Sequence, residues 1–102
     1  MQVLVVEDNF FCEVAVVNLL EQYGFESHSA TDGQEAFELV KDRFEKTGTT
    51  YKLILMDVYM PICDGFKSVE LIRAFLKEKS EQGYTIERPP YICFLTAHFM
   101  TV

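Results

Sequence analysis

The chain has 102 residues, of which 49% are hydrophobic and 25% charged, and its formal net charge is −7. This length and balance indicate a single globular domain with one modest core. The acidic charge argues against a nucleic-acid surface, which needs clustered Lys and Arg, and the longest apolar run is far shorter than the ~20 residues that cross a bilayer.

The three cysteines, Cys12, Cys63 and Cys93, show no CxxC spacing. Their odd number indicates reduced thiols in a cytosolic protein, and two of them, in or beside apolar runs, are expected to be buried. A zinc site would need paired ligands, whereas His28 and His98 stand apart from each other. No basic leader with a cleavage site opens the chain, so the expected location is the cytoplasm.

The first strand and helix follow from the apolar pattern. The continuous apolar run at 3–6 predicts a strand buried on both faces of a parallel sheet. Asn9 is a candidate N-cap for a helix that runs to about Tyr23, where Gly24 suits a left-handed C-terminal cap. The apolar stripe of this helix is expected to comprise Val16, Val17, Leu20 and Tyr23.

The middle of the chain repeats the alternation of strand and helix. The short stretch 25–30 predicts a weaker strand at a sheet edge. Asp32 with Glu35 resembles a capping box that opens the next helix. The buried face of that helix is expected to comprise Ala36, Phe37, Val40 and Phe44. The apolar run 52–56 predicts a second buried strand, which ends on Asp57.

The last predicted elements are a helix and a strand. The helix follows the loop 58–65, and its inward residues are expected to be Phe66, Val69, Ile72 and Phe75 or Leu76. The charged stretch 77–88 indicates a frayed helix end with an exposed connection, and 91–95 an apolar strand. The order βαβαβαβ predicts an α/β fold, a doubly wound parallel sheet between layers of helices.

Polar side chains stand where the strong strands end. Glu7 and Asp8 follow the first strand, Asp57 ends the run 52–56, and Thr96 follows the last strand. Ligands of open α/β sheets bind beyond these carboxyl ends. Three carboxylates brought together repel one another unless a cation compensates, and Mg²⁺ prefers oxygen ligands. The pattern therefore predicts a Mg²⁺ site with one carboxylate acting as the nucleophile of a phosphoryl transfer.

Each of these residues also has a simpler interpretation on its own. Glu7 and Asp8 are typical of the start of a helix, where the macrodipole favours acids. Asp57 is typical of a turn after a strand, and Thr96 belongs to a residue type common in strands. Their joint occurrence at three strand ends is what favours the phosphoryl-transfer site.

Several segments together resemble the receiver domains of response regulators and hybrid histidine kinases, the CheY-like superfamily. They are VLVVEDN at 3–9, TDGQEA at 31–36, LMDVYMP at 55–61, the Asp-Gly pair at 64–65 and LTA at 95–97. The Glu-Asp-Asn form of the first segment looks most like receivers of hybrid kinases. The resemblance implies the flavodoxin-like fold with strand order 2-1-3-4-5.

The resemblance also implies a phosphorelay receiver and a role for each matching residue. Asp57 is implied as the phosphoacceptor, which receives its group from a phosphohistidine of a histidine kinase or histidine phosphotransfer protein. Asp8, Asp57 and the backbone carbonyl of Tyr59 are implied as Mg²⁺ ligands. Glu7 would assist through water, and Thr96 would hydrogen-bond the phosphoryl oxygens.

The sequence departs from the family after Thr96. A complete receiver continues with a helix, a strand and a helix, and that strand ends in a lysine that pairs with the phosphoryl group. Lys52 and Lys67 are poor replacements, because Lys52 begins a strand and Lys67 lies in a helix. We therefore expect one receiver domain over 1–102, incomplete at its C-terminus, in which the strand 91–95 is an apolar sheet edge that invites pairing with another chain.

Two other functions stay open at this point. A phosphorylation-defective receiver would act only as a docking module for a histidine kinase or phosphotransfer protein, which the missing lysine favours and the intact acidic residues oppose. A phosphatase of the haloacid-dehalogenase type also uses a strand-end Asp, but it needs a second Asp where this chain has Tyr59. The preferred interpretation is a signalling domain and not an enzyme, and no feature of the sequence sets its oligomeric state.

Overall fold

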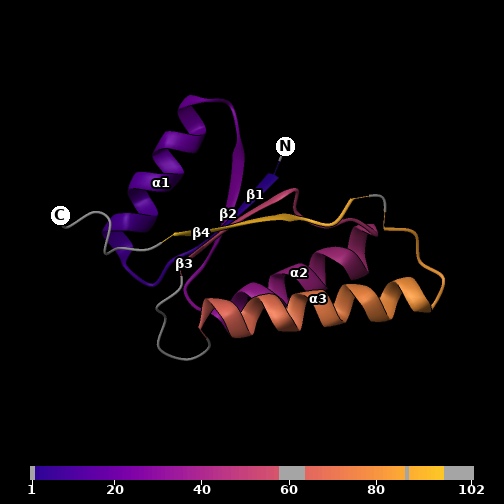
Figure 1. The fold of residues 1–102 in the computed structure, drawn as a ribbon. Helices are drawn as coiled ribbons and strands as arrows, with labels where there is room; N and C mark the ends of the chain where they lie inside the picture. The colour runs from indigo at the N-terminus through magenta and orange to yellow at the C-terminus, as the bar shows by residue number, and fades with distance from the viewer. Residues whose placement is uncertain (1, 58–63, 87, 96–102) are drawn as a thin grey trace.

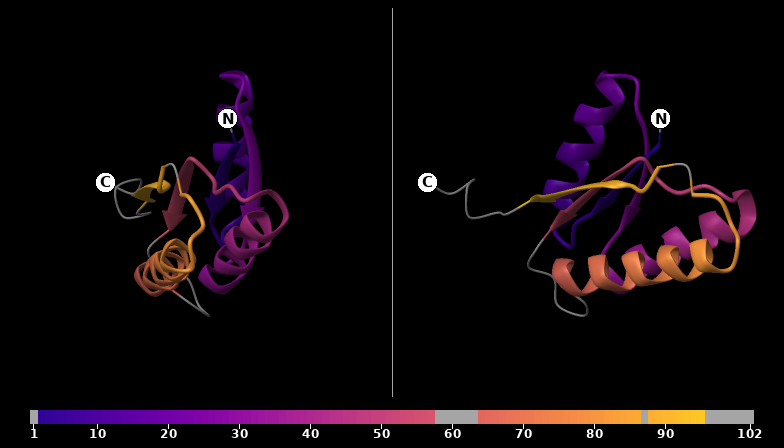
Figure 2. Two further views of the ribbon diagram at one scale, coloured as in Figure 1. Left: turned by 90° about the vertical axis from the view of Figure 1, so that its right-hand side faces the viewer. Right: turned by 45° about the vertical axis from the view of Figure 1, so that its right-hand side comes forward.

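The computed structural model describes residues 2–57, 64–86 and 88–95, which form a parallel sheet with helices on both faces (Figure 1, Figure 2). The elements are β1 (Gln2–Val6), α1 (Phe10–Gln22), β2 (Glu26–Ala30), α2 (Gly33–Thr47), β3 (Leu53–Asp57), α3 (Gly65–Glu81) and β4 (Tyr91–Leu95). The strand order is β2-β1-β3-β4, and each neighbouring pair is parallel. The predicted α/β fold with a parallel sheet between layers of helices is confirmed.

The core lies mainly between the sheet and the pair α2 and α3. Leu4 and Val6 pack into this core. Since side chains alternate between the two faces of a strand, Val3 and Val5 belong to the opposite face of the sheet. Helix α1 lies on that side (Figure 1). All four are 0% exposed, which explains the unbroken apolar run. The helices contribute the buried side chains Ala36, Val40, Phe44, Val69, Ile72, Phe75 and Leu76.

Each helix begins at a side chain that caps its first turn. Oxygens of Asn9, Asp32 and Asp64 accept hydrogen bonds from backbone N–H groups three residues further on, at 3.1, 2.8 and 2.8 Å. Such a cap contributes about 1 kcal/mol. Since Asn9 caps α1 only three residues after β1 ends, Glu7 and Asp8 are held in a short turn at the carboxyl edge of the sheet.

Two predicted core positions are wrong. Tyr23 is 74% exposed, because α1 ends before it and the chain turns at Gly24, where φ is 81°. Phe66 is 58% exposed, because it lies in the first turn of α3 and packs on Phe94 of the edge strand, with ring centroids 4.9 Å apart. The other predicted inward residues of α3 are buried.

The expectation of two buried cysteines is also wrong. Cys12 and Cys93 are both exposed free thiols. Cys12 lies in the first turn of α1, which has no buried residue, and Cys93 lies on β4 at the edge of the sheet. Cys63 falls outside the described residues. Among the helices of the described ranges, none has the length and apolar character that crossing a membrane requires.

Candidate functional site

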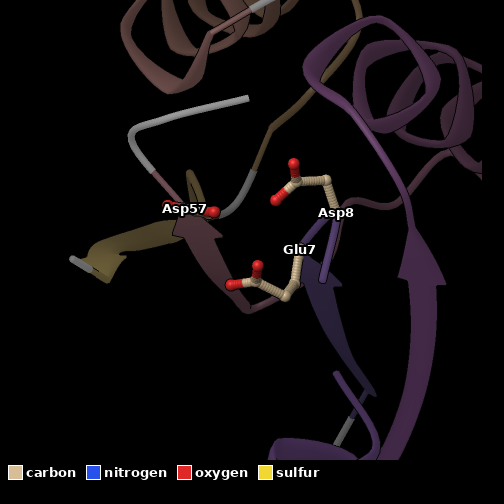
Figure 3. A group of neighbouring side chains, drawn as sticks. All are labelled: Glu7, Asp8 and Asp57. Carbon is tan, nitrogen blue, oxygen red and sulfur yellow. The ribbon is translucent and has the colours of Figure 1, made fainter. Parts of the chain in front are cut away.

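Glu7, Asp8 and Asp57 come together at the carboxyl edge of the sheet (Figure 3). One carboxylate oxygen from each residue lies within 4.8 Å of the others. The strand register explains this convergence: Val6 of β1 pairs with Met56 of β3, so the residues that follow them leave the sheet side by side. The predicted meeting of acidic strand ends is therefore present in the structure.

The three carboxylates differ in their exposure to solvent. Asp57 is 5% exposed, Glu7 is half-buried and Asp8 is exposed. A deep carboxylate beside two more accessible ones suits a site where one group reacts while the others hold a ligand from the solvent side. Asp57 is also the buried end of β3, so its backbone is fixed by the parallel ladder to β4.

The close approach of three carboxyl groups affects the protonation of Glu7. Burial raises the pKa of the Glu7 carboxyl from 4.5 to about 7. A hydrogen bond donated by the backbone N–H of Asn9 to Glu7 Oε1, 3.0 Å long, lowers this pKa, whereas the charge of Asp57 raises it further. The site therefore favours a bound proton on Glu7 until another positive charge takes its place.

This donor set fits a hard divalent cation. All three groups offer carboxylate oxygens, which Mg²⁺ prefers over sulfur and imidazole ligands. Ligand oxygens of an octahedral Mg²⁺ at ~2.1 Å lie about 3 to 4 Å apart, and the three carboxylate oxygens here lie within 4.8 Å of one another.

Two predicted site residues, Tyr59 and Thr96, lie outside the described residues. Sequence reasoning did not single out Phe10 and Phe11, which begin α1 just after the acidic pair and Asn9 and are 71% and 82% exposed. Their rings contact each other edge to face, with centroids 5.9 Å apart. No clear signal of their exposure was present in the sequence, because neighbouring residues of a helix can share an apolar face.

Comparisons with known proteins agree with this geometry. The chain is 42% identical over 86 residues to the osmosensing histidine protein kinase SLN1 of Saccharomyces cerevisiae. The matched region covers 83% of this chain but only 6% of the kinase. The receiver domain of the histidine kinase CKI1 from Arabidopsis thaliana, solved with Mg²⁺ and BeF3−, is similar with a TM-score of 0.73 and 28% identity, over 95% of this chain and 66% of that one.

A third similar structure is a complex from Saccharomyces cerevisiae. It contains the histidine phosphotransfer signaling protein Ypd1 and the receiver domain of its downstream response regulator Ssk1. The TM-score is 0.71 at 24% identity, over 94% of this chain and 61% of that one. At this identity the similarity is one of fold. Residues 3–99 match the family described as the response regulator receiver domain. With its parallel sheet and its acidic strand ends, this chain belongs to the response regulator receiver domain family.

Proposed function

We propose that this chain is a phosphorelay receiver in which Asp57 accepts a phosphoryl group from a phosphohistidine, in a Mg²⁺-dependent reaction. The convergence of Glu7, Asp8 and Asp57 within 4.8 Å carries the proposal. Membership of the receiver family supports it, as does the similarity to a histidine kinase. The donor is a histidine kinase or a histidine phosphotransfer protein, the class of protein found with the similar Ssk1 receiver.

The chemical step requires Asp57 as a nucleophile. A carboxylate oxygen of Asp57 attacks phosphorus and forms an O–P bond while the P–N bond of the phosphohistidine breaks. The electron pair of the broken bond returns to the ring nitrogen, and the ring leaves as neutral imidazole when its other nitrogen carries a proton. The short turn after β1 and the end of β3 hold the acidic groups in place before the donor arrives, so little reorganisation is needed.

Mg²⁺ at this site would neutralise charge on the phosphoryl group during transfer. Asp8, Asp57 and the backbone carbonyl of Tyr59 would bind it directly, and Glu7 would bind it through water. Glu7 would release its proton when Mg²⁺ binds, because the cation supplies the charge compensation that the proton gives in the metal-free chain. Thr96 would hydrogen-bond the transferred group.

The surroundings of the site suit a protein donor. Phe10 and Phe11 are large, exposed and adjacent to the acidic turn, so they offer an apolar contact beside the reactive carboxylate. A donor helix that presents a phosphohistidine next to apolar residues would match this arrangement of acidic site and aromatic rim.

The proposed role is signalling in the cytoplasm by one receiver domain over 1–102, without an enzymatic reaction on small molecules of its own. Its direct test is transfer from a histidine phosphotransfer protein such as Ypd1 that carries radiolabelled phosphohistidine. We expect label to pass to the wild-type chain with Mg²⁺, but not with EDTA and not to Asp57→Asn. Asp64→Asn, a matched carboxylate change at a helix cap, should still accept label. A folded chain that binds the donor and gains no label would instead be a docking module.

A further inference from the structure

A pocket of about 280 Å³ lies at the amino edge of the sheet, the edge opposite Asp57. Its lining comes from the end of α2, from the turn between α2 and β3, and from the connection between α3 and β4. Lys52 directly precedes β3 and Asp57 ends that strand, so five residues of extended chain, roughly 17 Å, separate the two sites. The pocket is therefore distinct from the acidic cluster.

The turn after α2 forms one wall of the pocket and is held by its own hydrogen bonds. Helix α2 ends at Gly48, whose φ of 72° suits glycine and whose N–H donates to the carbonyl of Phe44, 2.8 Å away. The N–H of Thr49 donates to the hydroxyl oxygen of Thr47 at 3.2 Å. These bonds shape this wall before any ligand binds.

The connection between α3 and β4 forms the other wall and is fastened at both ends. The ring of Tyr84 contacts that of Phe44 edge to face, with centroids 5.7 Å apart, and Lys79 Nζ lies 5.4 Å from the centre of the Tyr84 ring. At the other end, the N–H of Tyr91 donates to the carbonyl of Lys52, 2.9 Å away. Figure 1 shows the part of the connection that follows α3 beside the end of α2. Both walls of the pocket are thus held in place by the fold.

The lining combines apolar surface with positive charge. Phe44 and Ile86 contribute the apolar surface, Lys52 and Arg88 each bring a cation, and none of the described lining residues is acidic. Both cations are exposed, and neither forms an ion pair with another described residue. In a chain whose net charge is −7, two such cations beside one pocket favour an anionic ligand.

Thr85 adds a hydroxyl donor to this lining. The other two lining threonines already use their hydroxyl hydrogens. Thr50 donates to a backbone carbonyl. The hydroxyl of Thr47 gives its hydrogen to a carbonyl of α2, so the Thr49 hydroxyl is the donor in the 2.7 Å contact between them. The Thr85 hydroxyl makes no hydrogen bond within the described part of the chain, so it is available to a ligand.

We propose that this pocket binds a small organic phosphate, in which a phosphoryl group is attached to an apolar body. The ammonium of Lys52 and the guanidinium of Arg88 would flank the phosphate, and Thr85 would donate a hydrogen bond to it. A phosphate is favoured over a carboxylate, because its charge of nearly −2 at neutral pH matches two cations. The apolar body would cover Phe44 and Ile86, which an inorganic anion would leave in contact with water.

The volume of the pocket limits the size of this body. Sites for small molecules begin at roughly 300 Å³, so a pocket of about 280 Å³ fits a phosphate that carries a single ring. Phenyl phosphate is therefore the probe, titrated into the pure 102-residue chain in EDTA and followed by calorimetry. Without Mg²⁺ the acidic cluster repels anions and does not contribute. We expect saturable one-to-one binding, at least about tenfold tighter than that of inorganic phosphate or of phenol.

Variants of single charges test the location of the bound phosphate. Lys52→Gln and Arg88→Gln should each weaken binding of phenyl phosphate about tenfold, and both should keep their circular dichroism because both side chains are exposed. Lys67→Gln is the matched control, since it removes the same charge from the first turn of α3, and should leave the affinity unchanged. Asp57→Asn should also bind as the wild type does, so this test is separate from that of the phosphoacceptor.

The same titration followed by amide NMR should move the signals of Gly48 and Thr85, which line the pocket, and leave those at the other edge of the sheet in place. The absence of saturable binding would overturn the proposal. So would an affinity that falls equally in Lys52→Gln and Lys67→Gln, because that result indicates attraction to the surface as a whole. Inorganic phosphate or phenol that binds as tightly as phenyl phosphate would contradict a ligand with both an anionic and an apolar part.

Discussion

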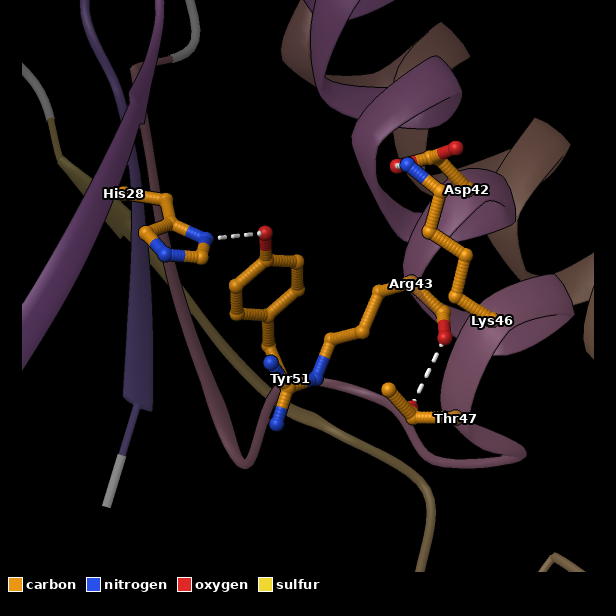
Figure 4. A network of polar contacts seen from close by, with 6 residues as sticks. All are labelled: His28, Asp42, Arg43, Lys46, Thr47 and Tyr51. Carbon is orange, nitrogen blue, oxygen red and sulfur yellow. Dashed lines mark hydrogen bonds and ion pairs between the residues drawn. The ribbon is translucent and has the colours of Figure 1, made fainter.

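The Nδ1 atom of His28 lies 2.7 Å from the hydroxyl oxygen of Tyr51, and this hydrogen bond joins a strand to the segment before a strand that is not its neighbour (Figure 4). His28 belongs to β2, Tyr51 precedes β3, and β1 lies between them. The guanidinium of Arg43 lies 4.9 Å from the centre of the Tyr51 ring. The contact therefore fastens the sheet on the side where β3 begins, away from Asp57 at its carboxyl end.

Tyr51→Phe tests the contribution of this contact. Tyr51 is 2% exposed, and burial raises the pKa of its hydroxyl, which keeps the group neutral at physiological pH. Removing the hydroxyl should lower the free energy of unfolding by about 1 kcal/mol in urea denaturation. Tyr23→Phe, at a 74% exposed position, should change it by less than about 0.5 kcal/mol. Equal effects of the two variants would show that the bond contributes nothing.

Ser68 is a buried polar residue that fixes the pair of helices beneath the site. It is 0% exposed and its hydroxyl donates to the carbonyl of Gly33, 2.8 Å away, so α3 is bonded to the start of α2. Ser68→Ala should destabilise the fold by about 1–2 kcal/mol, because it leaves a buried carbonyl without that donor. Ser80→Ala, at an exposed position of α3, is the control and should be neutral or slightly stabilising in the same denaturation experiment.

Glu7 gives the stability of the metal-free chain a pH dependence. Its pKa is 4.5 ordinarily and about 7 in the folded chain, so between these values the folded state binds more protons than the unfolded state. The contribution of Glu7 is therefore complete below about pH 4.5 and is lost as pH rises through 7. Thermal unfolding in EDTA should show this decline as a wild-type melting temperature that falls relative to that of Glu7→Gln as pH rises from about 4.5 to 7. A wild-type chain that gains stability relative to Glu7→Gln over this range would contradict it.

The acidic cluster should bind Mg²⁺ and be stabilised by it. Mg²⁺ should raise the melting temperature, and more at pH 8 than at pH 5, because the proton on Glu7 competes with the cation. Asp8→Asn should weaken Mg²⁺ binding roughly tenfold or more. Asp42→Asn removes a carboxylate from an exposed ion pair with Lys46 and should leave binding unchanged. The same loss in both variants would rule out a specific site.

The fold and the acidic site could be predicted from the sequence for a physical reason. Continuous apolar runs marked β1, which is buried on both faces, and β3, which is buried on one face and partly buried on the other. Parallel strands deliver their carboxyl ends to one edge of the sheet. Asp57 and Glu7 therefore met as expected. Their separation and the raised pKa of Glu7 needed coordinates, because they depend on burial in the turn after β1.

Exposure and long-range polar contacts were less accessible to sequence reasoning. Phe66 and Cys93 are apolar residues in predicted elements, but their exposure depends on what covers the β4 edge. His28 is 23 residues from Tyr51 and is brought to it across β1, a relationship that no local pattern encodes. Such contacts depend on the order and register of the strands in the sheet, and a prediction of helices and strands alone does not provide these.

The measurement that tests the central claim most directly is Mg²⁺-dependent labelling with acetyl phosphate, read by intact mass. The wild-type chain should gain one phosphoryl group with Mg²⁺ and none with EDTA, and Asp57→Asn should gain none although it remains folded. A folded wild-type chain without an adduct, or an adduct that persists in Asp57→Asn, would contradict the assignment of Asp57 as the phosphoacceptor.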